Sequence, residues 1–230
     1  MVEEEYPFDE LTFCNIGNPQ QFRQKPITFN REVLSCMLDP SLIGKNGINP
    51  DAARRAEKYL DVMVSAGSYT DSLGVPLLRR SVANFLHERD GVPLPDINDI
   101  FMTEGASQGV HMVLSSLITD RNDGIMIPIP QYPLYSAATC LYGGSAVPYY
   151  LNEEDWQLDE AELQQAYDKG KKEGKNVKCL VVINPGNPTG AIFSEETIQK
   201  IIRFATKNRV LLIADEVPIK SIAGLPREHL

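Results

Sequence analysis

Two uninterrupted apolar runs, at residues 179–183 and 210–214, constrain the fold of this chain more than any other feature. Each consists of aliphatic side chains without polar alternation, which is typical of a strand covered on both faces. The segment between them carries apolar residues at helical spacing, behind Ser194 as a candidate N-cap. A strand, a helix and a strand in this order form a βαβ unit. We therefore predict an α/β fold, a mostly parallel sheet with flanking helices.

The rest of the chain extends this pattern. Residues 50–66 and the stretch from Ser72 to Gly91 have the spacing of amphipathic helices. Gly105 separates a short predicted strand, 100–103, from another predicted helix. Beyond that helix we expect strands at 125–129 and 146–150, and helices at 136–141 and 159–172.

The charge balance and the cysteine spacing argue against several classes of protein. A formal net charge of −9 over 230 residues disfavours nucleic acid, because a phosphate backbone rewards clustered Lys and Arg. We interpret the lysine-rich stretch 169–178 as a solvated helix end. The four cysteines form no CxxC pair and no ligand spacing with histidine, so neither disulfides nor a metal site are expected. The acidic start MVEEEYPFDE, and the lack of any apolar stretch near ~18 residues, predict a cytoplasmic protein without a membrane partner.

Candidate ligand-binding residues fall where the predicted strands end, which is where open parallel sheets bind ligands. The turn formed by Gly105, Ala106 and Ser107 offers the free N–H groups of a helix start to an anion such as phosphate. Glycine in such a turn also serves simply to turn the chain. Tyr132, among the prolines of IPIPQYPLY, either stacks on a flat ligand or packs in the core.

Asn187 and Asp215 follow the two buried strands, and neither belongs in an apolar layer without a partner. An aspartate beside a protonated ring nitrogen would keep that ring cationic, and the asparagine could bond a ring hydroxyl. A phosphate, a flat ring, a protonated nitrogen and a phenolic oxygen together describe pyridoxal 5'-phosphate, a cofactor whose electronics the protein tunes. A nucleotide site would instead need GxGxxG or a Walker lysine, and neither is present.

With the motifs NPGNPTG, DEV, GAS and QYPLY, the chain resembles the class I and II aminotransferases of fold type I, which depend on pyridoxal phosphate. The strings GSYTDSLGVPLLRRSVANFLHERDG, MTEGASQGVHMVL and NIGNPQQFRQKPITFNREVL are similar to the alanine aminotransferase branch. The resemblance extends from about residue 14 to residue 217. It implies amino transfer between L-alanine and 2-oxoglutarate, giving pyruvate and L-glutamate.

The resemblance also implies a role for each candidate residue. Ala106 and Ser107 would hold the cofactor phosphate, and Tyr132 would stack on the pyridine ring. Asn187 would bond the ring hydroxyl, and Asp215 would pair with the ring nitrogen.

Two further residues imply contacts beyond this set. Tyr69 matches the family tyrosine that reaches the cofactor phosphate across a dimer interface, which implies a homodimer. Gly17 lies where the family's N-terminal stretch approaches the substrate. We accordingly expect an N-terminal segment, 1–45, with substrate-side and dimer contacts. The remainder, 46–230, would be a partial cofactor-binding large domain with a divergent tail at 218–230.

The tail departs from the family. Pro218 stands where the family has a tyrosine, and Lys220 is the only lysine after Asp215. Because the tail does not resemble the family segment that carries the Schiff-base lysine, we expect that lysine to be absent and Lys220 to be a surface group. We expect a truncated chain, inactive by itself, that arises from an unrelated ending or as a short isoform. Its strand at 210–214 would lack a sheet neighbour and bare apolar surface.

Two alternatives to alanine amino transfer stay open. One is a non-catalytic short product that dimerises with a full-length subunit. The other is an aminotransferase of the same branch that uses glyoxylate or another oxo acid.

Overall fold

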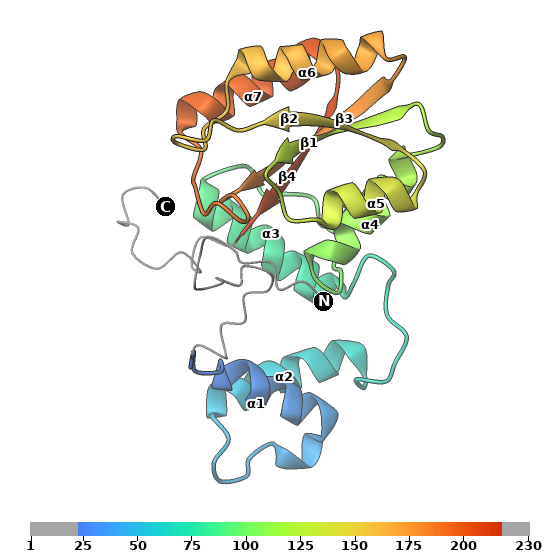
Figure 1. Cartoon of the computed structure of the whole chain (residues 1–230). Helices are drawn as coiled ribbons and strands as arrows, with labels where there is room; N and C mark the ends of the chain where they lie inside the picture. Colours follow the sequence, from blue (N-terminus) through green and yellow to red (C-terminus); the bar gives the residue numbers. More distant parts are fainter. Residues whose placement is uncertain (1–22, 218–230) are drawn as a thin grey trace, which may run out of the picture. The chain divides into compact units, whose positions relative to one another are not determined.

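The structure, a computed structural model, describes residues 23–217, which form two compact units (Figure 1). One unit comprises residues 23–88 and 92–100, and the other residues 89–91 and 101–217. Gly17, Pro218 and Lys220 lie outside the described residues. The functional division at residue 45 stays a prediction.

The first unit is helical. It contains α1 (Thr28–Leu38), η1 (Pro40–Leu42), α2 (Pro50–Met63), most of α3 (Pro76–Asp90) and η2 (Ile97–Asp99). A small core of Val33, Cys36, Ala52 and Ala56 holds α1 against α2. The buried guanidinium of Arg79 donates hydrogen bonds to the carbonyls of Gly74 (2.9 Å) and Ile97 (2.7 Å), which ties the loops at both ends of α3 to the helix.

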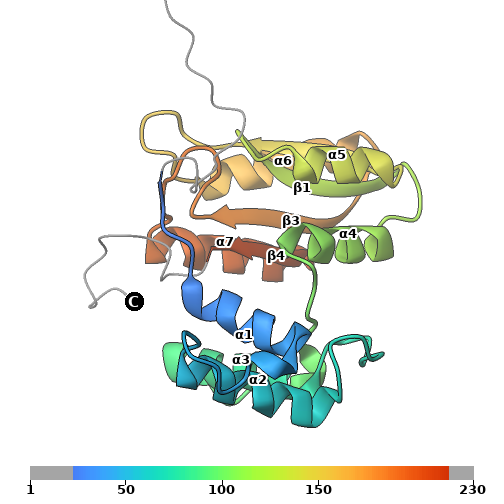
Figure 2. The same cartoon turned by 90° about the horizontal axis from the view of Figure 1, so that it is seen from below.

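The second unit is a four-stranded sheet between two helical layers. Its elements are α4 (Ala106–Leu117), β1 (Asp123–Ile129), α5 (Leu134–Leu141), β2 (Ser145–Tyr150), α6 (Glu160–Lys172), β3 (Asn176–Asn184), α7 (Glu195–Asn208) and β4 (Leu211–Glu216). The strand order is β2-β1-β3-β4, and every pair is parallel. Figure 2 shows β1, β3 and β4 running side by side. The predicted parallel α/β fold is confirmed.

The two faces of β3 pack against different helices because neighbouring side chains point to opposite sides. Leu180 and Val182 join the core under α6 and α7, whereas Cys179, Val181 and Ile183 join the core under α4 and α5. Figure 1 shows the α6 and α7 layer above the sheet and the α4 and α5 layer below it. Burial on both faces explains the absence of polar alternation in the sequence.

Several local expectations are confirmed, and one is wrong. Ser194 caps α7, since its Oγ accepts the Thr197 N–H at 3.1 Å, and the helix expected at 159–172 is α6. Residues 100–103, expected as a strand, form none, because no strand lies beside them among residues 23–217. No helix of the described residues is long and apolar enough to cross a bilayer.

β4 lies at an edge of the described sheet. Leu211, Ala214 and Glu216 of this strand are exposed, and Leu211 is 48% exposed. A strand of a parallel sheet is ordinarily covered on both faces, as β3 is. The side chains of β4 are less well covered, so this strand is less protected from solvent than β3.

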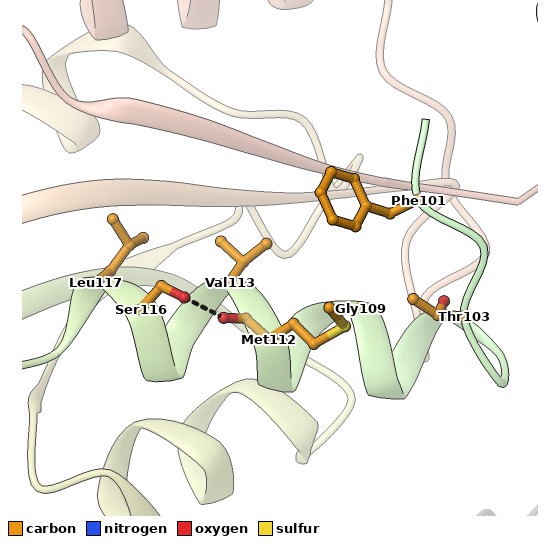
Figure 3. A pocket seen from close by; sticks show the side chains of 7 residues that line it. All are labelled: Phe101, Thr103, Gly109, Met112, Val113, Ser116 and Leu117. Carbon is orange, nitrogen blue, oxygen red and sulfur yellow. Dashed lines mark hydrogen bonds between the residues drawn. The ribbon is translucent and has the colours of Figure 1, made fainter. Parts of the chain in front are cut away.

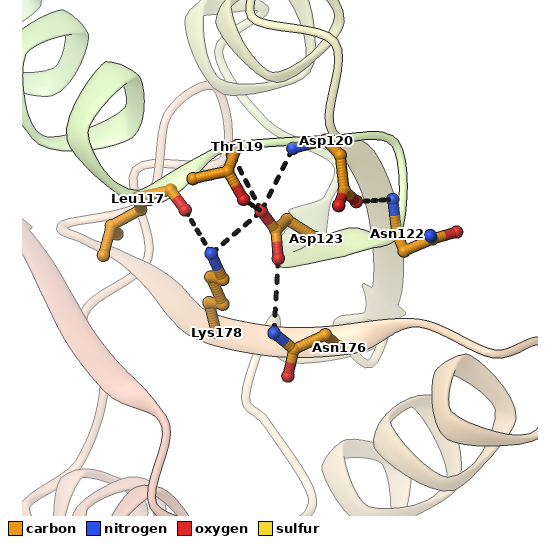
Figure 4. Close-up of polar contacts among 7 residues, drawn as sticks. All are labelled: Leu117, Thr119, Asp120, Asn122, Asp123, Asn176 and Lys178. Carbon is orange, nitrogen blue, oxygen red and sulfur yellow. Dashed lines mark hydrogen bonds and ion pairs between the residues drawn. The ribbon is translucent and has the colours of Figure 1, made fainter.

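A polar cluster around Asp123 fixes the amino edge of the sheet (Figure 4). The Oδ2 atom of Asp123 accepts hydrogen bonds from the backbone N–H and the hydroxyl of Thr119, both at 2.7 Å, and pairs with Lys178 Nζ at 2.8 Å. Its Oδ1 accepts from Asn176 Nδ2 at 3.2 Å. Burial by itself raises the pKa of the Asp123 carboxyl, but the hydrogen bonds from Lys178 and Thr119 outweigh it and hold the pKa well below its usual range.

Candidate active site

The carboxyl ends of β1, β3 and β4 lie at one edge of the sheet because the strands are parallel. Asp215 pairs in register with Ile183 near the ends of β4 and β3. Ile213, two residues earlier on β4, packs with the α4 and α5 core, so Asp215 shares that face. The carboxylate is therefore presented at the carboxyl edge, on the α4 and α5 side.

A buried tyrosine holds this carboxylate. Tyr135, in the first turn of α5, is fully buried, and its hydroxyl donates to Asp215 Oδ2 at 2.5 Å. Burial, the hydrogen bond and the negative charge of Asp215 raise the pKa of Tyr135 well above its usual value, which keeps the hydroxyl protonated as a donor. Sequence reasoning missed Tyr135. The available signal was its place three residues after Tyr132 in QYPLY, at the start of a helix.

The start of α4 points to the same edge. At the other end of the helix, the carbonyl of Leu117 accepts from Lys178 Nζ at 2.7 Å, at the amino edge of the sheet. The 12 residues of α4 extend from there toward the carboxyl edge, where Ala106 and Ser107 are exposed. Gly105 adopts φ +85°, which favours glycine, and no side chain caps the helix. The first amides of α4 are thus free of side-chain acceptors and suited to an anion.

Tyr132 lies between the end of β1 and the start of α5. Its side chain is 45% exposed, so it is not the core residue that one interpretation of the sequence allowed. Beside it, the side-chain oxygen of Gln131 is buried and has no hydrogen-bond partner among the described residues. An acceptor left in this way is suited to a donor from a bound ligand.

Asn187 lies in the turn that follows β3. The turn is closed by hydrogen bonds from Gly190 N–H to the Gly186 carbonyl (2.7 Å) and from Gly186 N–H to the Ala191 carbonyl (2.8 Å). A Cβ at position 186 would collide with the Thr189 hydroxyl unless that side chain moved, so the turn favours glycine there. Asn187 is exposed at the tip of this turn.

The structure thus places Ala106, Ser107, Tyr132, Asn187 and Asp215 at the carboxyl edge of one sheet. Their individual roles stay predictions.

The structure does not place the other two candidates, Tyr69 and Gly17, at this edge of the sheet. Tyr69 lies in the helical unit, where its side chain is fully exposed, and Gly17 lies outside the described residues.

A hollow of about 410 Å³ lies along α4 in the same unit (Figure 3). Its walls are Phe101, Thr103 and the side of α4 between Gly109 and Leu117. None of these residues is ionisable, so the hollow offers no charged group for a phosphate or a ring nitrogen. It is an uncovered, mainly apolar surface along α4.

Comparisons with known proteins identify the family. The sequence matches the model for aminotransferase class I and II over residues 40–224. The chain therefore belongs to the class I and II aminotransferases.

Among characterised relatives, the chain is 47% identical to "Alanine aminotransferase 1, mitochondrial" of Arabidopsis thaliana and 44% identical to "Glutamate--glyoxylate aminotransferase 2" of the same plant. The matches cover 92% and 90% of this chain but 40% and 44% of those proteins. In structure it is similar to the alanine aminotransferase from Pyrococcus furiosus, with a TM-score of 0.66 and 28% identity over 89% of this chain and 44% of that one. The chain thus spans less than half the length of these relatives.

The residues at the carboxyl edge fit pyridoxal phosphate by their chemistry. The uncapped amides of α4 suit a phosphate, and the carboxylate of Asp215 suits a ring N–H. The half-exposed ring of Tyr132 suits a flat ligand, and the unpaired side-chain oxygen of Gln131 can accept a hydrogen bond from a ligand.

Proposed function

We propose that this chain forms the cofactor-holding part of a pyridoxal-phosphate aminotransferase that moves an amino group between L-alanine and 2-oxoglutarate. One observation carries the proposal: the carboxylate of Asp215, hydrogen-bonded to Tyr135, lies at the same sheet edge as the uncapped start of α4. The relatives support alanine as the amino donor, because an alanine aminotransferase is among them at 47% identity.

Each residue contributes a distinct interaction to this function. Ala106 and Ser107 bind the phosphate through backbone N–H groups at the positive end of the α4 dipole. Tyr132 covers one face of the ring, and Asn187 donates to the ring hydroxyl. Asp215 holds a proton on the ring nitrogen by pairing with it. When bound, the cofactor supplies an electron sink for the carbon that carries the amino group.

The covalent attachment of the cofactor needs a lysine that the described residues do not place at this edge. Lys175 and Lys178 bind carbonyls at the amino edge, of Arg121 and Leu117. The other described lysines of this unit lie on α6 and α7. We therefore propose that the described part of the chain binds the cofactor without attaching it.

Dimerisation belongs to the same proposal. Tyr69 is fully exposed in its own chain, as a residue that serves a neighbouring subunit must be before assembly. Pairing of two such chains would then bring Tyr69 of one subunit to the cofactor site of the other. Co-expression of two differently tagged copies of the chain tests this, and recovery of unmixed species alone would contradict it.

The amino acceptor has a second candidate. The 44% identity to a glutamate–glyoxylate aminotransferase nearly equals that to the alanine enzyme, which favours glyoxylate as an alternative oxo acid. Assay of the active enzyme that contains this chain with 2-oxoglutarate and with glyoxylate separates the two by the ratio of kcat/KM.

Binding of pyridoxamine 5'-phosphate to the chain tests the cofactor site. We would measure its dissociation constant by ³¹P NMR titration for the wild type, Asp215→Ala and Asp168→Ala. Asp168 is an exposed carboxylate on α6, remote from the site, and serves as the matched control. We expect Asp215→Ala to weaken binding about tenfold or more, since a charge-assisted hydrogen bond contributes about 1.5–3 kcal/mol, and Asp168→Ala to have no effect. Equal affinities for all three proteins would refute the proposal.

A further inference from the structure

We propose that Tyr135 is a positioning residue that orients the carboxylate of Asp215 toward the ring nitrogen of the cofactor. The inference rests on the proposed function. It concerns a residue that the sequence motifs left unassigned and whose hydroxyl reaches from α5 to β4.

The position of the hydroxyl is fixed by the core. The ring of Tyr135 is fully buried among side chains of β1 and β3, which include Ile125, Ile127 and Val181. A ring packed in this way cannot swing, so its hydroxyl occupies one place at the carboxyl edge. From this position the Tyr135 hydroxyl donates a hydrogen bond of 2.5 Å to Oδ2 of Asp215.

This hydrogen bond fixes the orientation of the Asp215 carboxylate. Within residues 23–217, no other hydrogen bond reaches its carboxylate. With Oδ2 occupied, rotation about the bond to the carboxylate is restricted, and Oδ1 is left to accept a proton donor from a ligand. A supporting hydrogen bond of this kind orients the group that contacts the ligand, as outer partners orient metal ligands.

Tyr149 shows what a purely structural tyrosine hydroxyl looks like in the same unit. It is equally buried, but its hydroxyl donates to the backbone carbonyl of Val181 at 2.7 Å, inside the sheet. Tyr135 instead donates to a partly exposed carboxylate at the strand end. The two residues therefore provide a matched pair for experiment.

The test compares two probes that differ at one ring atom. Pyridoxamine 5'-phosphate has a ring N–H, and its 1-deaza analogue has a C–H there and cannot bond Asp215. We expect Tyr135→Phe to weaken binding of pyridoxamine phosphate about tenfold and to change the affinity for the analogue less than about twofold. Tyr149→Phe should leave the ratio of the two affinities unchanged.

A double-mutant cycle shows whether Tyr135 acts through Asp215. In the Asp215→Ala background, Tyr135→Phe should have no further effect on either probe. An equal loss for both probes, or an undiminished loss in the Asp215→Ala background, would overturn the inference. If Asp215→Ala weakens binding and Tyr135→Phe does not, the inference fails and the proposed function stands. If Asp215→Ala has no effect, both fail.

A second substitution guards against loss of folding in the phenylalanine variant. Incorporation of 3-fluorotyrosine at position 135 keeps the ring and the hydroxyl and makes the hydroxyl a stronger donor. A role through Asp215 predicts that it changes binding of pyridoxamine phosphate more than binding of the deaza analogue. Parallel changes for the two probes would contradict a role through Asp215.

Discussion

Replacement of Asp123 by asparagine should strongly destabilise the sheet unit. The Oδ2 atom carries two bonds from Thr119 at 2.7 Å and the ion pair with Lys178 at 2.8 Å, and Oδ1 accepts from Asn176. The asparagine side chain has only one accepting oxygen. Its NH₂ group would therefore face one of the donors that now bind Asp123, and that donor would lose its acceptor. Loss of a charged hydrogen bond costs about 1.5–3 kcal/mol, and an unsatisfied donor costs about 1–3 kcal/mol. Because Asn176 and Thr119 are partly reached by water, we expect about 3 kcal/mol in total.

Urea denaturation at pH 7 measures this loss, and Asp120→Asn is the control. Asp120 accepts one bond, from Asn122 N–H at 2.7 Å, in an exposed turn, so the same chemical change should cost less than about 1 kcal/mol there. A loss below about 1 kcal/mol for Asp123→Asn would refute the reasoning.

The pH dependence gives an independent check. The folded pKa of Asp123 is lowered, so the stability that the carboxylate contributes is complete above the ordinary carboxyl pKa and declines as pH falls below it. The difference between the wild type and Asp123→Asn should therefore shrink by about 1 kcal/mol between pH 5 and pH 3. A constant difference would show that folding does not lower the pKa of Asp123.

Three further outcomes are expected. Tyr149→Phe should lower the free energy of unfolding by about 1 kcal/mol, since the Val181 carbonyl loses its buried donor; a neutral result in urea denaturation would contradict this. Ser194→Ala should cost about 1 kcal/mol through loss of the α7 cap on Thr197, and Ser194→Gly less, as the same assay would show. Borohydride treatment with pyridoxal phosphate should leave no stoichiometric adduct within residues 23–217 by mass spectrometry. One trapped cofactor mapped to a lysine of this range would contradict binding without attachment, and one mapped to Lys220 would overturn its interpretation as a surface group.

The sheet could be predicted from the sequence because its inner strands are covered on both faces. Residues 179–183 show no alternation, and the structure buries both sides of β3 there. The strand expected at 100–103 failed for a related reason. A short apolar run does not predict whether a neighbouring strand is available for pairing. No strand lies beside residues 100–103 in the described part of the chain.

The candidate site was predictable only in part. Asp215 and the turn at Gly105 stand out because a carboxylate and a glycine are unexpected at the ends of apolar elements. Tyr135 did not stand out, because a tyrosine on the face of a predicted helix is ordinarily interpreted as a core residue. Its ring is indeed core, and only the hydroxyl reaches β4, 80 residues away in sequence. Contacts of such long range follow from the tertiary fold and not from local pattern.

The most direct test of the central claim is to locate the bound ligand by NMR. Pyridoxamine phosphate would be titrated into the ¹⁵N-labelled chain while the backbone and side-chain amide signals are followed. We expect the amides of Ala106 and Ser107, the side-chain amide of Asn187 and the backbone amide of Asp215 to shift together, with one dissociation constant. Shifts confined to other residues, such as Val113 and Leu117 of the apolar hollow, would contradict it.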